Sequence, residues 1–133
     1  MIGPILLGIR AALVADDALN AVTQWYHAVA PGSATVPYGV IQYAAGGDTN
    51  ETPLDELDED WTVKIVDTDA ARAMTLGDAV RTTLHNATLT LGAGWTAYDC
   101  EHTGPAFFLP EQVESTQYFH AGSTYRIRAH EEA

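Results

Sequence analysis

Residues 25–43 read WYHAVAPGSATVPYGVIQY, and no other stretch of the chain says as much about its fold. A short apolar strand pattern leads into the turn cluster Pro31-Gly32-Ser33, and a second strand begins at Pro37-Tyr38. Apolar residues at helical spacing precede this stretch over residues 4–15 and follow it over residues 67–86. The sequence therefore predicts strands framed by two helices.

The rest of the chain adds further strands. Residues 61–66 alternate apolar and polar side chains, as a half-buried strand does. We expect further strands over residues 88–91, 95–102, 113–120 and 124–129. A loop is predicted over residues 104–110 and a turn or bulge at Gly122-Ser123. This order is typical of an α+β fold, with a mostly antiparallel sheet and both helices on one face, in a single domain over residues 1–133.

An acidic segment at residues 46–60 separates the second and third strands. It holds seven acidic side chains and no basic one. Like charges one helical turn apart repel, so a helix is disfavoured and we expect a long, mobile, solvated loop. Its acidic residues are candidates for contact with a partner, above all Asp55, Glu56, Asp58, Glu59 and Asp60.

The last strand carries the second candidate assembly surface. Arg126 and Arg128 lie on one face of it, because side chains alternate along a strand. They are two of only six basic residues in the chain. We expect them either to be solvated at an edge or to pair with acidic groups of a neighbouring subunit.

The composition limits the classes of function. Six basic residues against 18 acidic ones give a formal net charge of −12, which disfavours both a grip on nucleic acid and an anionic membrane surface. Cys100 is the single cysteine, so no intramolecular disulfide is possible, and we expect its thiol to be buried.

No motif for catalysis, cofactor binding or metal binding occurs in the sequence. The five histidines form no HxH or HExxH pattern, and GxSxG, Walker A and GxGxxG are absent. We therefore expect no catalytic residue, no cofactor and no metal site. Two alternatives remain open: a small α+β enzyme using His102 or His120 with Asp99 or Glu101, and a soluble binding module.

This order of elements resembles the tail terminator, or tail completion, proteins of long-tailed bacteriophages. The resemblance runs from Ile5 to Arg128 and rests on three features of the pattern. An N-terminal helix is followed by a strand-turn-strand hairpin whose second strand begins at Pro37-Tyr38. An extended loop, a strand and a long helix come next. The short run Leu89-Thr90-Leu91 and the closing strands complete the order.

The resemblance implies a structural protein of the virion tail, made in the host cytoplasm. It implies a homo-oligomeric ring, commonly a hexamer, at the head-proximal end of the tail tube. Such a ring stops polymerisation of the tube and presents a docking face to a head-completion or neck protein. DNA passes through its lumen without specific binding. The acidic segment is compatible either with lining that lumen or with contacting a basic partner.

Overall fold

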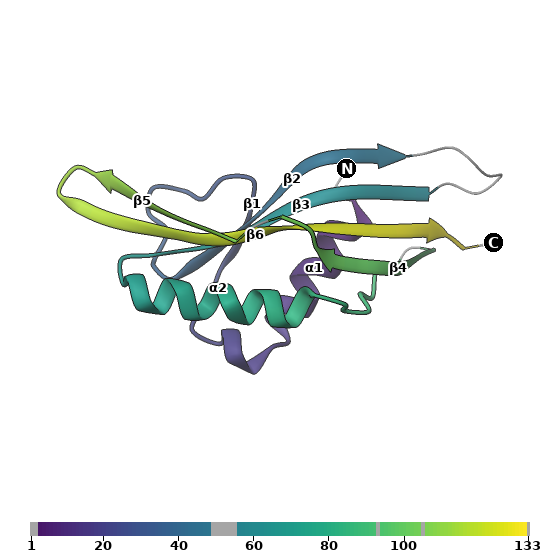
Figure 1. The fold of residues 1–133 in the computed structure, drawn as a ribbon, viewed down its shortest axis with the longest axis horizontal. Coiled ribbons are helices and arrows are strands. Elements are labelled where there is room, and N and C mark those ends of the chain that lie inside the picture. Colours follow the sequence, from purple (N-terminus) through teal and green to yellow (C-terminus); the bar gives the residue numbers. More distant parts are fainter. Residues whose placement is uncertain (1–2, 49–55, 93, 105, 133) are drawn as a thin grey trace.

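The computed structural model describes residues 3–48, 56–92, 94–104 and 106–132, which form an α+β fold as predicted (Figure 1). Its elements, in chain order, are α1 (Pro4–Val14), the short 3-10 helix η1 (Asp17–Leu19), β1 (Trp25–His27), β2 (Tyr38–Asp48), β3 (Glu56–Asp67), α2 (Ala70–Leu84), β4 (Trp95–His102), β5 (Phe107–Val113) and β6 (Thr116–Glu131). The strand order in the sheet is β1-β2-β3-β6-β4, and β5 also pairs with β6. Every pairing of these strands is antiparallel except that of β1 with β2. The expected hairpin of β1 and β2 is therefore wrong: the connection over residues 28–37 carries the chain back, so that β2 runs in the same direction as β1.

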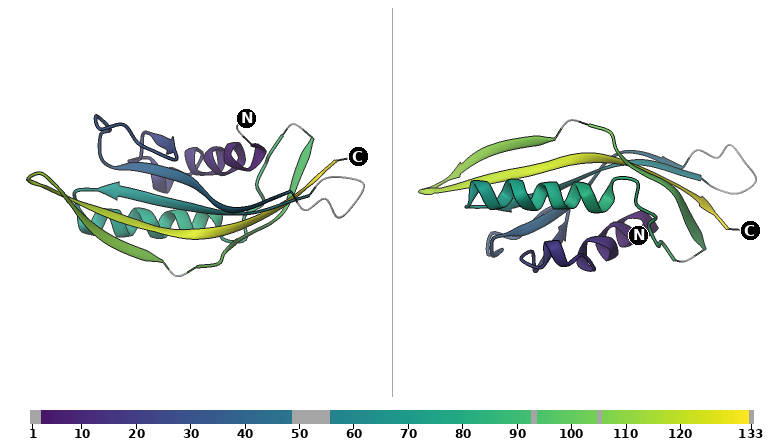
Figure 2. Two further views of the ribbon diagram at one scale, coloured as in Figure 1. Left: turned by 90° about the horizontal axis from the view of Figure 1, so that it is seen from above. Right: turned by 60° about the horizontal axis from the view of Figure 1, so that its bottom comes forward.

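Both helices cover the same face of the sheet, and the core lies between the helices and this face (Figure 2). Side chains at helical spacing on α1 and α2 meet those at alternate positions of the strands. The largest completely buried side chains include Ile5, Ile9, Leu13, Ile41, Ile65, Leu84, Tyr125 and Ile127. The predicted helices are thus confirmed, as is burial of the thiol of Cys100. Within the described residues, no helix is long and apolar enough to cross a membrane.

Helix α2 lies inside the predicted helical segment, residues 67–86, and both of its ends have a clear local cause. The side chain of Asp69 caps the first turn by accepting a hydrogen bond from the Arg72 N–H at 3.1 Å. Asn86, just beyond the helix, adopts a φ of 61°, a conformation that asparagine tolerates well. A Cβ atom on Gly77 would lie 3.2 Å from the Cβ atom of Ala121. The small residue therefore lets α2 pack closely on β6.

The prediction of a loop over residues 46–60 is wrong at both ends. β2 continues to Asp48 and β3 begins at Glu56, so strand structure occupies most of the segment. Repulsion between neighbouring acidic groups is weaker in a strand than in a helix, because successive side chains point to opposite faces. The partner strand also supplies cations, with Asp58 opposite Arg128 and Asp60 opposite Arg126. Residues 49–55 lie outside the described residues.

The strand boundaries in the last third of the chain also differ from prediction. Residues 88–91 form no strand; Leu89 and Leu91 are buried, and Leu91 packs against Gly8 of α1. The predicted loop over 104–110 is largely β5, which tolerates Pro110 because it lies at the edge of the sheet.

Gly122 is no turn but the middle of β6. A Cβ atom there would lie 2.5 Å from the backbone oxygen of Val63. Glycine at this position therefore permits a close approach between β6 and β3. The chain reverses at Glu114 instead, whose φ is 56°. The predicted break between two strands is thus one continuous strand, Thr116–Glu131.

Candidate assembly surfaces

The face of the sheet opposite the helices carries a row of ion pairs across three strands. Arg126 of β6 donates two hydrogen bonds to Asp58 of β3, with Nε–Oδ1 at 2.8 Å and Nη2–Oδ2 at 2.6 Å. Arg128 donates from Nε to Asp99 Oδ2 of β4 at 2.9 Å and lies over the ring of Tyr98. The hydrogen bonds from Arg126 lower the pKa of Asp58, against a smaller opposing effect of burial. We call this set of five residues the charged row.

Several of the predicted assembly residues pair with one another in the charged row. The structure brings together Asp58, Arg126 and Arg128, with Glu56 and Asp60 at neighbouring positions of the ladder. Both arginines form ion pairs within the chain, so neither needs a carboxylate of a neighbouring subunit to be paired. Glu59 lies elsewhere: it accepts a hydrogen bond from Trp61 Nε1 at 2.9 Å. The remaining candidate, Asp55, lies outside the described residues.

Asp99 and Tyr98 also belong to this face, although neither was predicted to form part of an assembly surface. A bulge between Ala97 and Asp99 shifts the register of β4 against β6. Asp99 is thereby placed opposite Arg128, and Glu101 opposite Arg126. Alternation counted from the buried Ala97 would have turned Asp99 towards the helices, and the bulge lets both Ala97 and Cys100 be buried with Asp99 on the other face. Carboxylates flank the two arginines on both sides. This face of the sheet, which we call the open face, therefore has more carboxylates than arginines.

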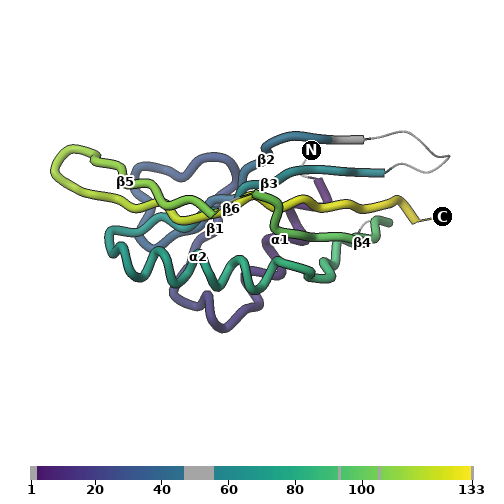
Figure 3. The backbone as a smooth tube through the Cα atoms, in the orientation of Figure 1, coloured from purple at the N-terminus to yellow at the C-terminus, as the bar shows by residue number. Residues whose placement is uncertain are grey.

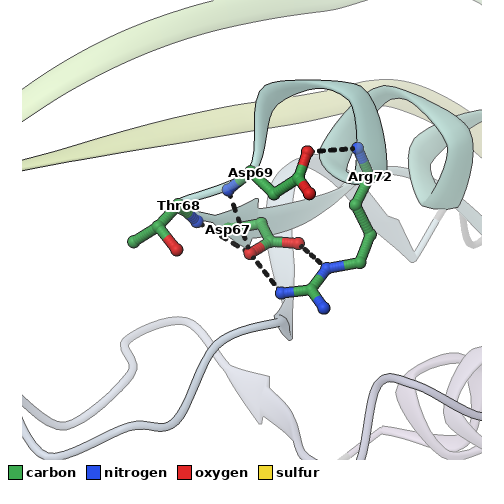
Figure 4. Close-up of polar contacts among 4 residues, drawn as sticks. All are labelled: Asp67, Thr68, Asp69 and Arg72. Carbon is green, nitrogen blue, oxygen red and sulfur yellow. Dashed lines mark hydrogen bonds and ion pairs between the residues drawn. The ribbon is translucent and has the colours of Figure 1, made fainter.

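A second group of charged side chains joins the end of β3 to the first turn of α2 (Figure 4). The carboxylate of Asp67 is completely buried and accepts hydrogen bonds from Arg72 Nη2 at 2.8 Å and from Arg72 Nε at 2.5 Å. It also accepts from the backbone N–H groups of Thr68 at 2.7 Å and Asp69 at 3.3 Å. Burial is the largest single influence on the pKa of Asp67 and would raise it. The hydrogen bonds together outweigh burial, so the pKa of Asp67 is lowered.

The hairpin of β5 and β6 extends beyond the N-terminal end of α2 (Figures 1 and 3). Phe108, Leu109 and Val113 of β5 are exposed although they are large and apolar. Phe108 stacks on Phe119 of β6, with ring centroids 5.5 Å apart. Exposed apolar side chains gathered on one projecting element are typical of a surface that binds another protein.

The geometry does not assemble the catalytic pairs considered for an enzyme. Asp99 is bound to Arg128, while His120 contacts Glu111 at 3.0 Å. The backbone N–H of His102 donates to Nδ1 of His85 at 3.2 Å, and burial is the main cause that lowers the pKa of His102.

Neither the thiol nor the metal-binding side chains offer another site. Burial raises the pKa of Cys100 to about 12, so its thiol stays protonated. Among the described residues, no three His, Cys, Asp or Glu side chains are grouped to hold a metal ion.

The fold and its surfaces describe a small α+β protein with an acidic face opposite the helices and an apolar projecting hairpin. The sequence gives the family. Residues 8–130 match the family described as "Tail completion protein gp17", and the chain belongs to it. The predicted resemblance is thereby confirmed, and the protein is a structural component of the phage virion tail.

A solved structure shares the fold. A chain from a structure titled "Virion of native gene transfer agent (GTA) particle" superimposes with a TM-score of 0.67 at 19% sequence identity. The match covers 93% of this chain and 92% of that chain, so the fold is similar from end to end. Among curated proteins, none matches the sequence.

Proposed function

We propose that the protein is a tail terminator: it forms a homo-oligomeric ring, commonly a hexamer in proteins of this kind, at the head-proximal end of the tail tube. The ring stops polymerisation of the tube and offers a docking surface to a head-completion or neck protein. The protein carries out no catalysis in this role.

The observation that carries the proposal is the projecting hairpin of β5 and β6 on a chain of the tail completion family. Phe108, Leu109 and Val113 remain exposed in the single chain. Burying such side chains contributes about 25 cal/mol per Å² of apolar surface, so contact with a neighbouring protein stabilises the assembly. The tube protein, the neck protein and a second copy of the chain are the partners available at the end of a tail.

The charge of the chain suits a ring through which DNA passes. The net charge is −12, and the open sheet face has more carboxylates than arginines. Phosphate groups are repelled by such a surface, so DNA would cross the lumen without being held. Both arginines of the charged row are occupied by carboxylates, which leaves them less available to bind phosphate.

Deletion of the gene, followed by complementation, tests this function. We expect lysates without the protein to contain overlong tubes and separate heads, and the wild-type gene to restore joined virions. A matched variant, His102→Gln with His120→Gln, should restore them equally, because it removes acid–base chemistry and keeps hydrogen-bonding capacity. Tails of normal length joined to heads in the deletion lysate would refute termination. Failure of a folded double variant would favour the enzyme alternative.

A further inference from the structure

A mostly apolar pocket of about 230 Å³ opens between α2 and β5. Its lining comes chiefly from Met74 and Gly77 of α2, Phe107 and Phe108 of β5, and Ala121 of β6, with Asp78 and Arg81 of α2 adding charge. Met74 and Phe108 are exposed in the single chain. The pocket therefore has the size and chemistry to receive an aliphatic side chain, beside a carboxylate able to accept a hydrogen bond.

Helix α1 presents side chains that suit such a pocket. Its inner face is buried in the core, but Leu7 and Val14 are 50% and 62% exposed. They lie seven residues apart, on one side of the helix, and Arg10 is exposed between them. A short helix that is apolar on two sides packs one of them on its own core and offers the other to a partner.

The pocket and the stripe of Leu7, Arg10 and Val14 lie at opposite edges of the molecule. In both views of Figure 2, α1 lies on one side of α2 and β5 on the other. Leu7 and Arg10 border a recess with Trp25 of β1, the strand at one edge of the sheet, whereas β5 lies beyond β6 towards the other edge. A chain cannot fill its own pocket with its own stripe, but a second copy can.

The charges of the two surfaces are complementary. Arg10 lies within the stripe and Asp78 lies in the pocket wall. Among the residues that the structure describes, neither has an ion-pair partner, whereas Arg72, Arg126 and Arg128 each have one. The pocket also contains Arg81, one helical turn after Asp78, so Arg10 is directed to the Asp78 side of it.

We propose that α1 of one copy docks in the pocket between α2 and β5 of the next copy, with Leu7 as the inserted side chain, Val14 beside it and Arg10 paired with Asp78. The contact is head-to-tail, so each added copy leaves one stripe and one pocket free. Such contacts propagate until the rotation between copies closes a ring. This inference rests on the proposed ring and names the surfaces that build it.

Cysteine cross-linking tests the pairing directly. The variants Leu7→Cys and Met74→Cys are purified separately, and cross-linking is measured alone and after mixing, by disulfide formation and with a short bis-maleimide, in the presence of tail tube. Both positions are about half exposed, so both variants should fold. Cys100 is buried and does not interfere. Val29→Cys, at a position 77% exposed on the connection after β1, replaces Leu7→Cys as the control.

We expect a cross-linked dimer from the mixture at least tenfold above either variant alone, and none from the Val29 control. The double variant Leu7→Cys with Met74→Cys should give a ladder of covalent oligomers that ends at the size of the ring. Links between two Leu7→Cys chains, or from Leu7→Cys to the tube protein, would overturn the inference.

A charge exchange provides a second readout that does not depend on cysteine geometry. Arg10→Asp should reduce the fraction of rings seen by native mass spectrometry at least tenfold, and Asp78→Arg in the same chain should restore it. If rings form but Leu7→Cys does not cross-link to Met74→Cys and Arg10→Asp leaves the fraction of rings unchanged, the docking surface is wrong. The proposed function would remain intact in that case. Absence of any ring from the wild-type protein, even with tube present, would overturn the proposed function itself.

Discussion

The buried carboxylate of Asp67 holds α2 against the end of β3, and its removal gives a calculable loss of stability. Asp67→Ala deletes two hydrogen bonds from Arg72 and those from the N–H groups of Thr68 and Asp69. Hydrogen bonds to a charged group contribute about 1.5–3 kcal/mol each, but the 45% exposed side chain of Arg72 regains water. We expect the free energy of unfolding to fall by roughly 3 kcal/mol, which lowers Tm by about 10 °C.

The complementary variant, Arg72→Met, leaves the carboxylate buried without its cation and reverses the pH dependence. In the wild type the pKa of Asp67 is lowered, so its contribution is present above the unfolded pKa of about 3.9 and is lost as pH falls through the folded pKa. Without Arg72 we expect burial to dominate and the pKa to rise. The contribution is then present below about pH 3.9 and is lost as pH rises through the raised pKa.

Urea unfolding at about pH 7 and about pH 4.5 measures both effects. We expect Arg72→Met to lose more stability, relative to wild type, at the higher pH, and Asp67→Ala to lose a similar amount at both. Arg81→Met, on the same helix, is the control, since Arg81 has no ion-pair partner among the described residues. Equal loss of stability at both pH values in Arg72→Met, or a loss below about 1 kcal/mol in Asp67→Ala, would contradict this role of the Asp67–Arg72 pair.

Three further predictions concern other parts of the fold. Gly39→Ala should destabilise the protein by about 1–3 kcal/mol, because the new Cβ atom would lie 2.0 Å from the ring of Trp25, whereas Gly32→Ala, with no atom within 4 Å, should be nearly neutral in a thermal melt. The thiol of Cys100 should react with a thiol reagent at mildly alkaline pH only after unfolding, because burial raises its pKa to about 12; rapid reaction of the native protein would contradict this. Arg126→Glu should lower Tm, because it sets a carboxylate among those on the two flanking strands; an unchanged Tm with lost assembly would restore the view that this arginine serves a neighbouring subunit.

The helices and the central strands could be predicted because their signals are local. Apolar spacing, the cap at Asp69 and the αL-tolerant Asn86 fix α2 within the chain itself. The segment around Asp58 could not be placed in this way, because the cation that makes an acidic strand tolerable lies 68 residues away at Arg126. Local charge therefore predicted a loop where long-range pairing produces a strand.

The assembly surfaces were only partly visible in the sequence for the same reason. Arg126 and Arg128 were recognised as a pair on one face, but their carboxylate partners depend on the ladder register and on the bulge before Asp99. Gly122 was predicted to form a turn, but glycine also permits close packing of two backbones, here against Val63. The projecting hairpin followed from none of these local signals.

Growth of tail tubes in vitro shows whether the protein ends a tube by forming a ring. Purified tube protein is polymerised with and without the chain, and tube lengths and tube ends are measured by electron microscopy. We expect substoichiometric amounts of the protein to shorten the tubes, and a ring to be present at one end only. Tubes of unchanged length with no ring at either end, although the added protein is folded, would contradict this prediction.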